Sequence, residues 1–500
     1  MPQPVNSDAS QIHLQKVIGI GFSGHRKLED EAKCRALICE FLSDRKAKVP
    51  GIVYGISSAA AGADLLFCEC CISLDIPLRI LLPSSRQDFK GDFEPADWAR
   101  AEALFAQAIS VEETSDGALK SEKYYECGIR TIQESQVLLA LWDGEPARGL
   151  GGTEQMVTFA RKIGRPTFWI NTDTGATEIF NRDAMESLLV DPELDFLNGL
   201  PDMGSRPATG SQGDRAKAWL QKLDENATRF APHVRRLAVV PILCTSAAAF
   251  LTGAGLHLPH PQQWLTVGTI LGVVAIVIPL LLRLPQQRLR WERTRAAAEV
   301  CRSILAVWHA QLTQSLIEPE MLPELAGMIT TLDLMKALDM RDHPGSLAEF
   351  KKDYRVNRIA DQEKFFSRQA MKAERLAQKT RLISAACIAL ACSVGVFDFV
   401  AHAAFKNTTW MPGHDALSVA ISALFQISTI AIAFAMIKDS NRRKSRYQEL
   451  SDWLRTWDAE LESLMTWQSV LRVVGRIERA LLVELLEWRS LMRHSQIGRK

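Results

Sequence analysis

Two hydrophobic patterns divide the chain. Up to about residue 175, short apolar runs alternate with longer stretches in which apolar residues recur at helical spacing. Beyond residue 236, apolar residues form long runs that are almost free of Asp, Glu, Lys and Arg. The first pattern is typical of an α/β domain, and the second is typical of helices that cross a membrane.

The first pattern predicts a sheet of parallel strands. The expected strands are Val17–Phe22, Ile52–Ile56, Leu78–Pro83, Val137–Asp143 and Thr167–Ile170. Because helical stretches alternate with these short apolar strands, we expect a doubly wound, Rossmann-like α/β domain. We assign residues 1–200 to this domain and residues 201–236 to a linker and lead-in helix.

The second pattern contains four apolar runs. They begin at Leu237, Trp264, Leu382 and Ala416, and each is close to the roughly 20 residues that cross about 30 Å of hydrocarbon. A buried helix of a soluble protein accounts for one such run, but four runs arranged as two close hairpins favour membrane helices. We therefore expect an all-α membrane region of four transmembrane helices, with hairpins at 237–283 and 382–437.

Basic residues predict the orientation of these hairpins. The charges that flank their open ends are Arg235, Arg236, Arg283, Arg288, Arg290, Lys379, Arg381, Lys438, Arg442, Arg443, Lys444 and Arg446. The turns carry only Lys406 as a strong base. Because positive residues favour the cytoplasmic side, we expect both termini, the helical region 284–381 and the C-terminal helices 438–500 in the cytoplasm.

The segments outside the apolar runs have helical spacing of their own. Apolar residues recur along one side of 291–312 and of 447–492, and the second stretch includes Trp453, Trp457 and Trp467. Aromatic stripes of this kind are usually packing surfaces. We therefore expect a cytosolic helical bundle between the subunits of a homo-oligomer.

One acidic residue, Asp398, lies within the third run. Counted from Leu382 at about 1.5 Å per residue, it lies roughly 25 Å across the bilayer, near the outer interface. The carboxylate either marks a solvated helix end or faces an aqueous path or a partner helix. The sequence leaves both interpretations open.

Composition narrows the class of protein. The 500 residues are 47% hydrophobic and 23% charged, which excludes a disordered tail, a collagen-like repeat and a small disulfide scaffold. A net charge of +1 gives no reason to expect binding to duplex nucleic acid. The ten cysteines lack metal-ligand spacing, so we expect reduced thiols and no metal site, with Cys68, Cys70 and Cys71 packed in a helical core.

Small and polar residues follow three of the predicted strands. The candidate ligand-binding residues are, in chain order, Gly21, Ser23, Gly24, His25, Arg26, Ser57, Gly62, Asp64, Asp143, Gly151, Gly152, Thr153 and Glu154. In a parallel sheet, such loops meet at the carboxyl edge, where helix N-termini offer N–H groups to anions. Glycines let a phosphate or sugar approach the backbone, and Arg26 or His25 supplies positive charge. This arrangement predicts a nucleotide-type ligand.

Parts of the sequence resemble known families. The segments VIGIGFSGHR, SSAAAGADLL, LPSSRQDFKGDF and LALWDGEPARGLGGTEQMVTFARKIGRP resemble the SLOG domain, a Rossmannoid superfamily that includes the DprA and Lonely Guy proteins. Residues 353–390 resemble the beginning of a SLATT-type membrane module, whose helices accompany SLOG and nucleotidyltransferase genes in bacterial defence loci. Together the resemblances imply a bacterial inner-membrane effector of antiviral defence. Its SLOG domain would sense a nucleotide-derived signal, such as a cyclic oligonucleotide or an ADP-ribose derivative.

The sequence departs from the hydrolase pattern of the Lonely Guy enzymes. Those enzymes hydrolyse nucleoside monophosphates at a PGGxGTxxE motif, in which the glutamate acts on the ribose. When Gly152 and Thr153 are aligned with its GT, Met156 takes the glutamate position, and Glu154 is out of register. A thioether cannot act as a base.

We therefore expect a sensor that forms a channel or breaches the membrane, rather than an enzyme, with no cofactor besides its ligand. The first alternative is a membrane-anchored nucleotide hydrolase or glycosylase that uses Glu154 or Asp64. The second is a transporter or scaffold in which the ligand cleft is vestigial.

Overall fold

The computed structural model of the protein describes residues 12–114, 119–147, 149–202, 210–237, 240–257, 259–281, 284–310, 316–317, 321–342, 345–404, 414–437 and 440–494. The chain forms two compact units, Met1–Lys222 with Val300–Gly345 and Leu223–Glu299 with Ser346–Lys500. It passes from one unit to the other within the helices α9 (Gln212–Leu237) and α12 (Leu284–Ala306), and between Gly345 and Ser346.

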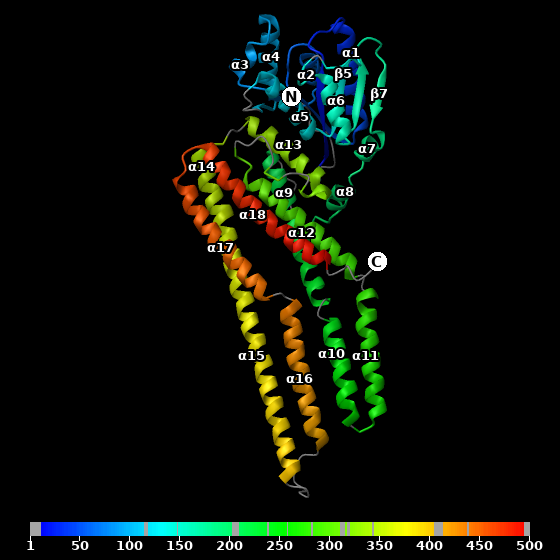
Figure 1. Ribbon diagram of the computed structural model, residues 1–500, viewed down its shortest axis with the longest axis vertical. Coiled ribbons are helices and arrows are strands. Elements are labelled where there is room, and N and C mark those ends of the chain that lie inside the picture. Colours follow the sequence, from blue (N-terminus) through cyan, green and yellow to red (C-terminus); the bar gives the residue numbers. More distant parts are fainter. Residues whose placement is uncertain are drawn as a thin grey trace. The chain divides into compact units, whose positions relative to one another are not determined.

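A sheet of seven strands forms the centre of the first unit (Figure 1). The strands are β1 (Lys16–Gly24), β2 (Gly51–Ser57), β3 (Leu78–Leu82), β4 (Ser110–Glu113), β5 (Val137–Trp142), β6 (Thr167–Asn171) and β7 (Thr177–Phe180). Their order is β4-β3-β2-β1-β5-β6-β7, and every neighbouring pair is parallel except β6 and β7. The Rossmann-like, parallel-rich α/β domain expected from the sequence is therefore confirmed.

Helices cover both faces of this sheet. They include α1 (Glu31–Lys48), α2 (Ala63–Ser73), α3 (Arg86–Lys90), α4 (Pro95–Gln107), α5 (Lys120–Glu134), α6 (Thr153–Lys162), α7 (Arg182–Ser187) and α8 (Pro192–Asn198). Apolar side chains of α1, α2 and α4 pack on one face against Ile20, Ile80 and Leu139. Those of α5 and α6 pack on the other face against Leu138 and Ala140. Alternate residues of a strand thus enter different cores, as the two-residue period of a strand requires.

The sequence pattern misses two edge strands. β4 has the sequence SVEE, and its Glu112 is buried because it pairs with Arg79 at 3.0 Å and with Arg130. β7 is short, mostly exposed and antiparallel to its neighbour. Neither strand has the continuous apolar run that marks a parallel strand buried on both faces.

A helix from much later in the chain completes the first unit. α13 (Ala326–Asp342) follows the 3-10 turn η3 (Pro323–Leu325), and its Leu334 packs with Val17 and Tyr54 of the sheet. The Thr331 hydroxyl donates to the Gln15 carbonyl oxygen at 3.0 Å. Residues 300–345 thus share a compact unit with the sheet, although the sequence pattern places them in the cytosolic helical region 284–381.

Two cysteines are joined rather than reduced. Cys39 on α1 and Cys70 on α2 form a disulfide across 31 positions of the sequence, which corrects the expectation of reduced thiols throughout. Cys68 and Cys71 are free and fully buried, as expected for core packing. The pairing depends on how α1 packs against α2, and the spacing of cysteines along a sequence does not reveal such packing.

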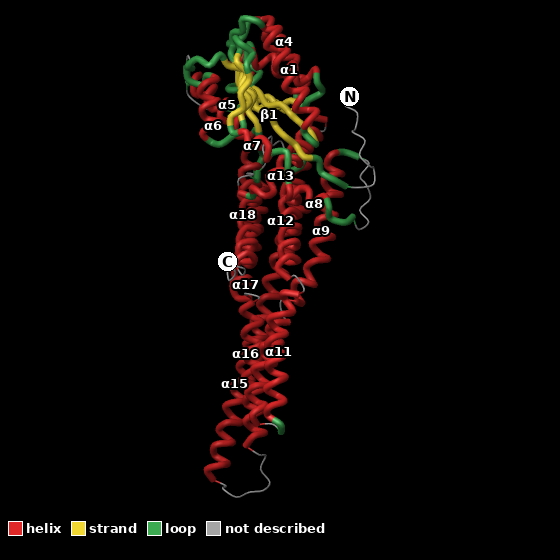
Figure 2. Tube along the Cα trace, turned by 90° about the vertical axis from the view of Figure 1, so that its right-hand side faces the viewer, coloured by secondary structure: helices red, strands yellow, loops and turns green. Residues whose placement is uncertain are grey.

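Helices form the described part of the second unit (Figure 2). Besides parts of α9 and α12 they are α10 (Val240–Ala254), α11 (Pro261–Leu281), α14 (Leu347–Asp353), α15 (Ala360–Ala404), α16 (His414–Ile437), α17 (Ser440–Ser463) and α18 (Trp467–His494), with the 3-10 turn η1 (Gly255–His257) and the π-helical turn η4 (Tyr354–Ile359). α15 packs against α16 and α17, and α10 packs against α11 and α16. The expectation of a helical C-terminal region is confirmed.

Two helices of the described chain, and not the expected four, are long and apolar enough to cross a membrane. They cover Leu347–Ala401 and Ala416–Ala435. The apolar segments Val240–Ala254 and Pro261–Val277 are shorter than these two. The prediction of four spans is therefore wrong for these residues. The expected flanking bases Arg283, Lys406 and Lys438 lie outside the described part.

Small residues are buried along one face of α15. Ala377, Ser384 and Ala391 recur at seven-residue spacing, and the hydroxyls of Ser384 and Ser428 are hydrogen-bonded at 2.7 Å. Small side chains let two helices approach closely. Asp398 takes the next position in this series and is half-buried, which favours the interpretation of a carboxylate that faces a partner helix.

A buried polar network joins η4 to α18. Arg358 donates to the Glu478 carboxylate through Nε at 2.9 Å and through Nη2 at 2.6 Å, and the Tyr354 hydroxyl donates to the same carboxylate at 2.7 Å. All three side chains are almost fully buried. Because a buried charge without its partner is costly, we expect this network to fix the register of η4 against α18.

We expect Glu478→Gln to destabilise the protein by about 3 kcal/mol, because Arg358 would stay charged and buried without a carboxylate. The matched control is Glu460→Gln, which removes an exposed ion pair with Arg476 and should cost about 0.5 kcal/mol. Denaturant unfolding of the full-length protein in detergent measures both effects. Equal losses of stability would contradict the role given to the network.

Candidate functional site

The candidate site lies where the strand connections change direction. From β1 the chain moves through β2, β3 and β4 on one side, and it then returns to β5 on the other side of β1. In an open parallel sheet, such a switch point leaves a crevice at the carboxyl ends of the strands. The loops after β1, β2 and β5 carry the residues predicted from the sequence, and all three lie at this edge.

His25 and Asp143 meet across the switch point. His25 Nε2 lies 3.1 Å from the backbone nitrogen of Asp143 and 3.0 Å from its Oδ1. A neutral imidazole accepts from the N–H at that atom, whereas a protonated one donates to the carboxylate. The Asp143 carbonyl oxygen accepts from Asn171 Nδ2 at 3.0 Å. These contacts fix the loop after β1 to the loop after β5.

Asp64 lies in the first turn of α2 and is buried. Its Oδ2 accepts from the Ser57 hydroxyl at 3.1 Å and from the Ser58 hydroxyl at 2.6 Å. Burial raises the pKa of this carboxyl, and the two serine hydrogen bonds and the positive charge of Arg26 oppose the increase. Asp64 therefore orders the loop between β2 and α2.

The backbone conformation at the start of α2 requires a glycine at position 62. Its φ is +95°, and a Cβ there would lie 2.3 Å from the carbonyl oxygen of Arg26. The next residue, Ala63, donates its N–H to the His25 carbonyl oxygen at 3.0 Å. Glycine adopts this conformation without steric cost and permits the close contact. The loops after β1 and β2 are thus joined directly.

Arg26 reaches from this junction to α5. Its guanidinium carbon lies 4.5 Å from the centre of the Tyr124 ring, and the Tyr124 hydroxyl donates to Asp92. Burial raises the pKa of Tyr124. Arg26 is exposed, so its charge is accessible at the edge. Ser58, Tyr124 and Asp92 are not among the residues predicted from the sequence, and no local motif marks Tyr124 or Asp92 as a neighbour of Arg26.

The loop after β5 packs against α5. Gly151 has φ +86°, and a Cβ there would lie 3.1 Å from the backbone nitrogen of Tyr125. The Gly151 N–H donates to Gln155 Oε1 at 2.8 Å. Gly152 is the N-cap of α6, and Thr153 is buried behind it. The two glycines therefore let the loop pass close to α5.

Gly21 and Gly24 are both in β1, where helices pack closely on the strand. A Cβ on Gly21 would lie 2.6 Å from Ser135 Oγ, and a Cβ on Gly24 would lie 2.6 Å from Ala63 Cβ. The close packing of helices on β1 therefore explains why neither position carries a side chain. Ser23 lies between them and is half-buried at the end of the strand.

The position aligned with a hydrolase glutamate points into the core. Met156 is 1% exposed, and a Cβ on Gly128 of α5 would lie 2.3 Å from its Sδ. Glu154 accepts from the Thr158 hydroxyl at 2.9 Å, one turn along the same helix. Met156 is therefore part of the core, and the Glu154 carboxylate is hydrogen-bonded along its own helix.

A cavity of about 1060 Å³ lies near the other end of the sheet. Lys16, Gln136 and Arg165 line it near the amino-terminal ends of β1, β5 and β6. Two arginines of its lining are paired with Glu134: Arg79 Nη2 lies 2.9 Å from Oε2, and Arg130 Nε lies 2.5 Å from Oε1. Because the switch point and the helix N-termini lie at the carboxyl edge, we place the candidate site there and not in this cavity.

The groups at the carboxyl edge suit an anionic, hydrogen-bonding ligand. They comprise a guanidinium, an imidazole, hydroxyls and the first backbone N–H groups of α6, to which Gly152 gives no side-chain cap. Among the residues that the structure describes, no group of three or more His, Cys, Asp or Glu side chains is placed to hold a metal ion.

Comparison with known proteins identifies no family. No protein-family model matches the chain, and no curated protein matches it. The SLOG and SLATT resemblances therefore stay predictions.

We expect Asp64→Asn to remove a pH-dependent part of the stability. Because the folded-state pKa is raised, the stabilising contribution of Asp64 is present below its ordinary pKa of 3.8 and is lost as the pH rises through the raised value. Asparagine still accepts from the two serines but does not titrate. The unfolding temperature of the wild type should therefore fall relative to the variant as the pH rises above the ordinary pKa of 3.8 and through the raised pKa. A difference that is independent of pH would contradict this assignment.

Proposed function

We propose that the protein is a membrane-bound sensor of a nucleotide-derived ligand. The ligand binds at the carboxyl edge of the sheet, near Arg26, Gly62 and Gly152, and binding changes the arrangement of the membrane helices. The observation that carries the proposal is the exposure of the apolar segments of α15 and α16.

The apolar side chains of these segments face outward, whereas those of a core helix in a soluble protein are buried. Only 11% of the apolar window of each helix is buried. Phe399 is 76% exposed and Leu382 is 70% exposed. Burial of one large apolar side chain is worth about 1.5–3 kcal/mol, so a long helix surface of this kind is strongly unfavourable in water. A lipid bilayer around α15 and α16 accounts for it.

The shorter apolar helices support contact with lipid as well. α10 packs against α16, and α11 packs against α10. On α11 the apolar side chains of Ile270, Val273 and Ile276 are exposed. We propose that α10 and α11 are immersed beside the α15–α16 hairpin.

Basic residues support a cytoplasmic position for the rest of the chain. Lys379 and Arg381 are exposed on α15 just before the apolar segment, and Arg443 is exposed near the start of α17. These positions are the two ends of the same hairpin. From the positive-inside rule we propose that both termini lie in the cytoplasm of a bacterium, with the hairpin in the inner membrane.

Nucleotide-type chemistry is supported by the way the edge is built. Arg26 supplies a charge suited to phosphate, and the N-terminus of α6 offers N–H groups to an anion. Gly62 and Gly151 let the loops of this edge pack closely on the Arg26 backbone and on α5. A cyclic oligonucleotide or an ADP-ribose derivative has the matching phosphates and hydroxyls. The buried Met156 and the Glu154–Thr158 hydrogen bond favour binding over hydrolysis.

The output follows from the membrane helices. A single α15–α16 hairpin encloses no pore, so a channel or breach needs several copies of the chain. We therefore propose a homo-oligomer whose permeability rises on ligand binding, in the role of a bacterial antiphage effector.

We expect one of ADP-ribose, AMP or a cyclic dinucleotide to raise the unfolding temperature of the detergent-solubilised protein and to release dye from vesicles that contain it. Gly62→Ala should abolish both responses, because its Cβ would meet the Arg26 backbone at 2.3 Å in a left-handed conformation. The matched control is Gly149→Ala, which has nothing within 4 Å of the added atom and should keep both. No stabilisation by any of these ligands, or an unchanged response in Gly62→Ala, would contradict the proposal.

A further inference from the structure

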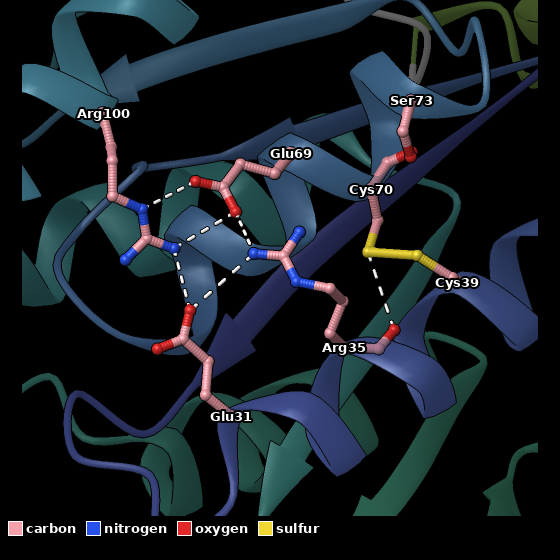
Figure 3. Close-up of a disulfide and its surroundings, with 7 residues drawn as sticks. All are labelled: Glu31, Arg35, Cys39, Glu69, Cys70, Ser73 and Arg100. Atoms are coloured by element: carbon pink, nitrogen blue, oxygen red, sulfur yellow. Dashed lines mark hydrogen bonds and ion pairs between the residues drawn. A yellow bond between two sulfur atoms is a disulfide. The ribbon is translucent and has the colours of Figure 1, made fainter.

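The disulfide joins the two helices that follow the candidate edge (Figure 3). Cys39 lies on α1 and Cys70 lies on α2, with their Cα atoms 5.5 Å apart. α1 follows the loop that carries His25 and Arg26, and α2 begins directly after Gly62. The bond therefore ties together the helices that support two of the three loops at the edge.

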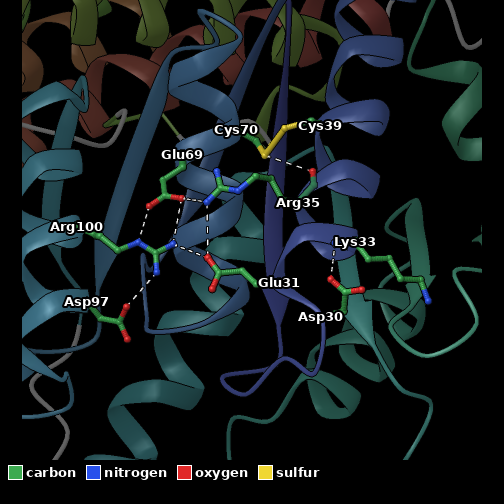
Figure 4. A network of polar contacts seen from close by, with 9 residues as sticks. All are labelled: Asp30, Glu31, Lys33, Arg35, Cys39, Glu69, Cys70, Asp97 and Arg100. Atoms are coloured by element: carbon green, nitrogen blue, oxygen red, sulfur yellow. Dashed lines mark hydrogen bonds and ion pairs between the residues drawn. A yellow bond between two sulfur atoms is a disulfide. The ribbon is translucent and has the colours of Figure 1, made fainter.

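Ion pairs join the same helices to α4 (Figure 4). Glu69 of α2 accepts from Arg35 of α1 and from Arg100 of α4, whose Nε lies 2.7 Å from Oε1. Arg100 also contacts Glu31 of α1 at 3.0 Å. Ion pairs that stay partly exposed contribute little to stability one by one. The covalent bond is thus stronger than any one of these pairs in holding α1 to α2.

Access to the two sulfurs is unequal. Cys39 is half-buried, whereas Cys70 is fully buried. The nearby free thiols of Cys34, Cys68 and Cys71 are buried too, and burial raises the pKa of each. A raised pKa disfavours the thiolate, which is the reactive form. A soluble oxidant or reductant therefore reaches Cys39 first.

We propose that the bond between Cys39 and Cys70 is a reversible redox switch that sets how rigidly the carboxyl edge of the sheet is held. The oxidised form keeps the loops in one arrangement and favours ligand binding, since less order is lost when the ligand binds. In a cytoplasmic domain, a disulfide is commonly transient or redox-sensing. The effect on ligand binding rests on the proposed function, whereas the cysteine chemistry does not.

The switch uses ordinary thiol chemistry with an organic or hydrogen peroxide as oxidant. The Cys39 thiolate attacks the peroxide, which yields a sulfenic acid and an alcohol or water. The Cys70 thiol then attacks the sulfenic sulfur, forming the S–S bond and releasing water, so that two electrons pass from the thiols to the peroxide. A dithiol reverses the step by exchange at Cys39, which regenerates both thiols and leaves the reductant as a cyclic disulfide.

The test needs no ligand and uses the full-length protein in detergent. After treatment with tert-butyl hydroperoxide, Cys39 and Cys70 should both resist alkylation on unfolding, and after dithiothreitol both should be alkylated. Backbone hydrogen exchange in residues 58–67, which include Gly62 and Asp64, should be roughly tenfold slower in the oxidised form. Ligand-binding failure alone would leave these results unchanged, so the two proposals can be told apart.

Two variants and a control complete the experiment. In Cys39→Ser, the amides of residues 58–67 should exchange as in the reduced wild type whatever oxidant is added. Cys70→Ala should behave in the same way, and it tests the loss of the bond without placing serine at the half-buried position 39. Cys392→Ser removes an exposed thiol of α15 and should keep the full response. Equal exchange of residues 58–67 in the oxidised and reduced forms, or alkylation of Cys39 after peroxide, would overturn the proposal.

Discussion

The apolar surface of α15 and α16 has to be kept out of water, and the organisation of the second unit follows from this constraint. Large side chains such as Phe399 point outward, whereas small ones such as Ala391 are buried between helices. A soluble protein distributes them the other way. In a bilayer, close helix packing and interhelical hydrogen bonds replace the hydrophobic effect as the source of association, and the Ser384–Ser428 pair provides one such bond.

The first unit meets a different constraint under the proposed function, because the ligand would be held by loops without regular structure. Contacts of Asp143 with His25 and of Ala63 with His25 join the loops to one another, and Arg26 joins the first loop to Tyr124 of α5. A ligand that moves one of these loops therefore acts on the others and on α1 and α2 behind them. The chain leaves the first unit within α9, returns to it within α12 and leaves it again after Gly345, so covalent connections run from the first unit to the helices proposed to lie in the membrane.

The sequence predicted the features that depend on local pattern. The five strands β1, β2, β3, β5 and β6 are marked by apolar runs, and helices follow them along the chain. This alternation implies parallel strands, so the loops after β1, β2 and β5 were expected at the carboxyl edge of the sheet. β4 could not be found in this way because Glu112 is neutralised by arginines from β3 and α5. Contacts such as Arg26 with Tyr124, and the bond from Cys39 to Cys70, depend on tertiary packing. The number of spans was overestimated because apolar composition does not reveal where a helix ends, and α10 ends at Ala254.

Accessibility of Cys392 tests the membrane assignment most directly. Its thiol is exposed on α15, in the helix assigned to the bilayer. In proteoliposomes, a membrane-impermeant maleimide should leave Cys392 unlabelled, while it labels the cysteine introduced by Ser445→Cys at an exposed position of α17. Mass spectrometry of the two peptides gives the result. Labelling of Cys392 as fast as that of the introduced cysteine would contradict the account.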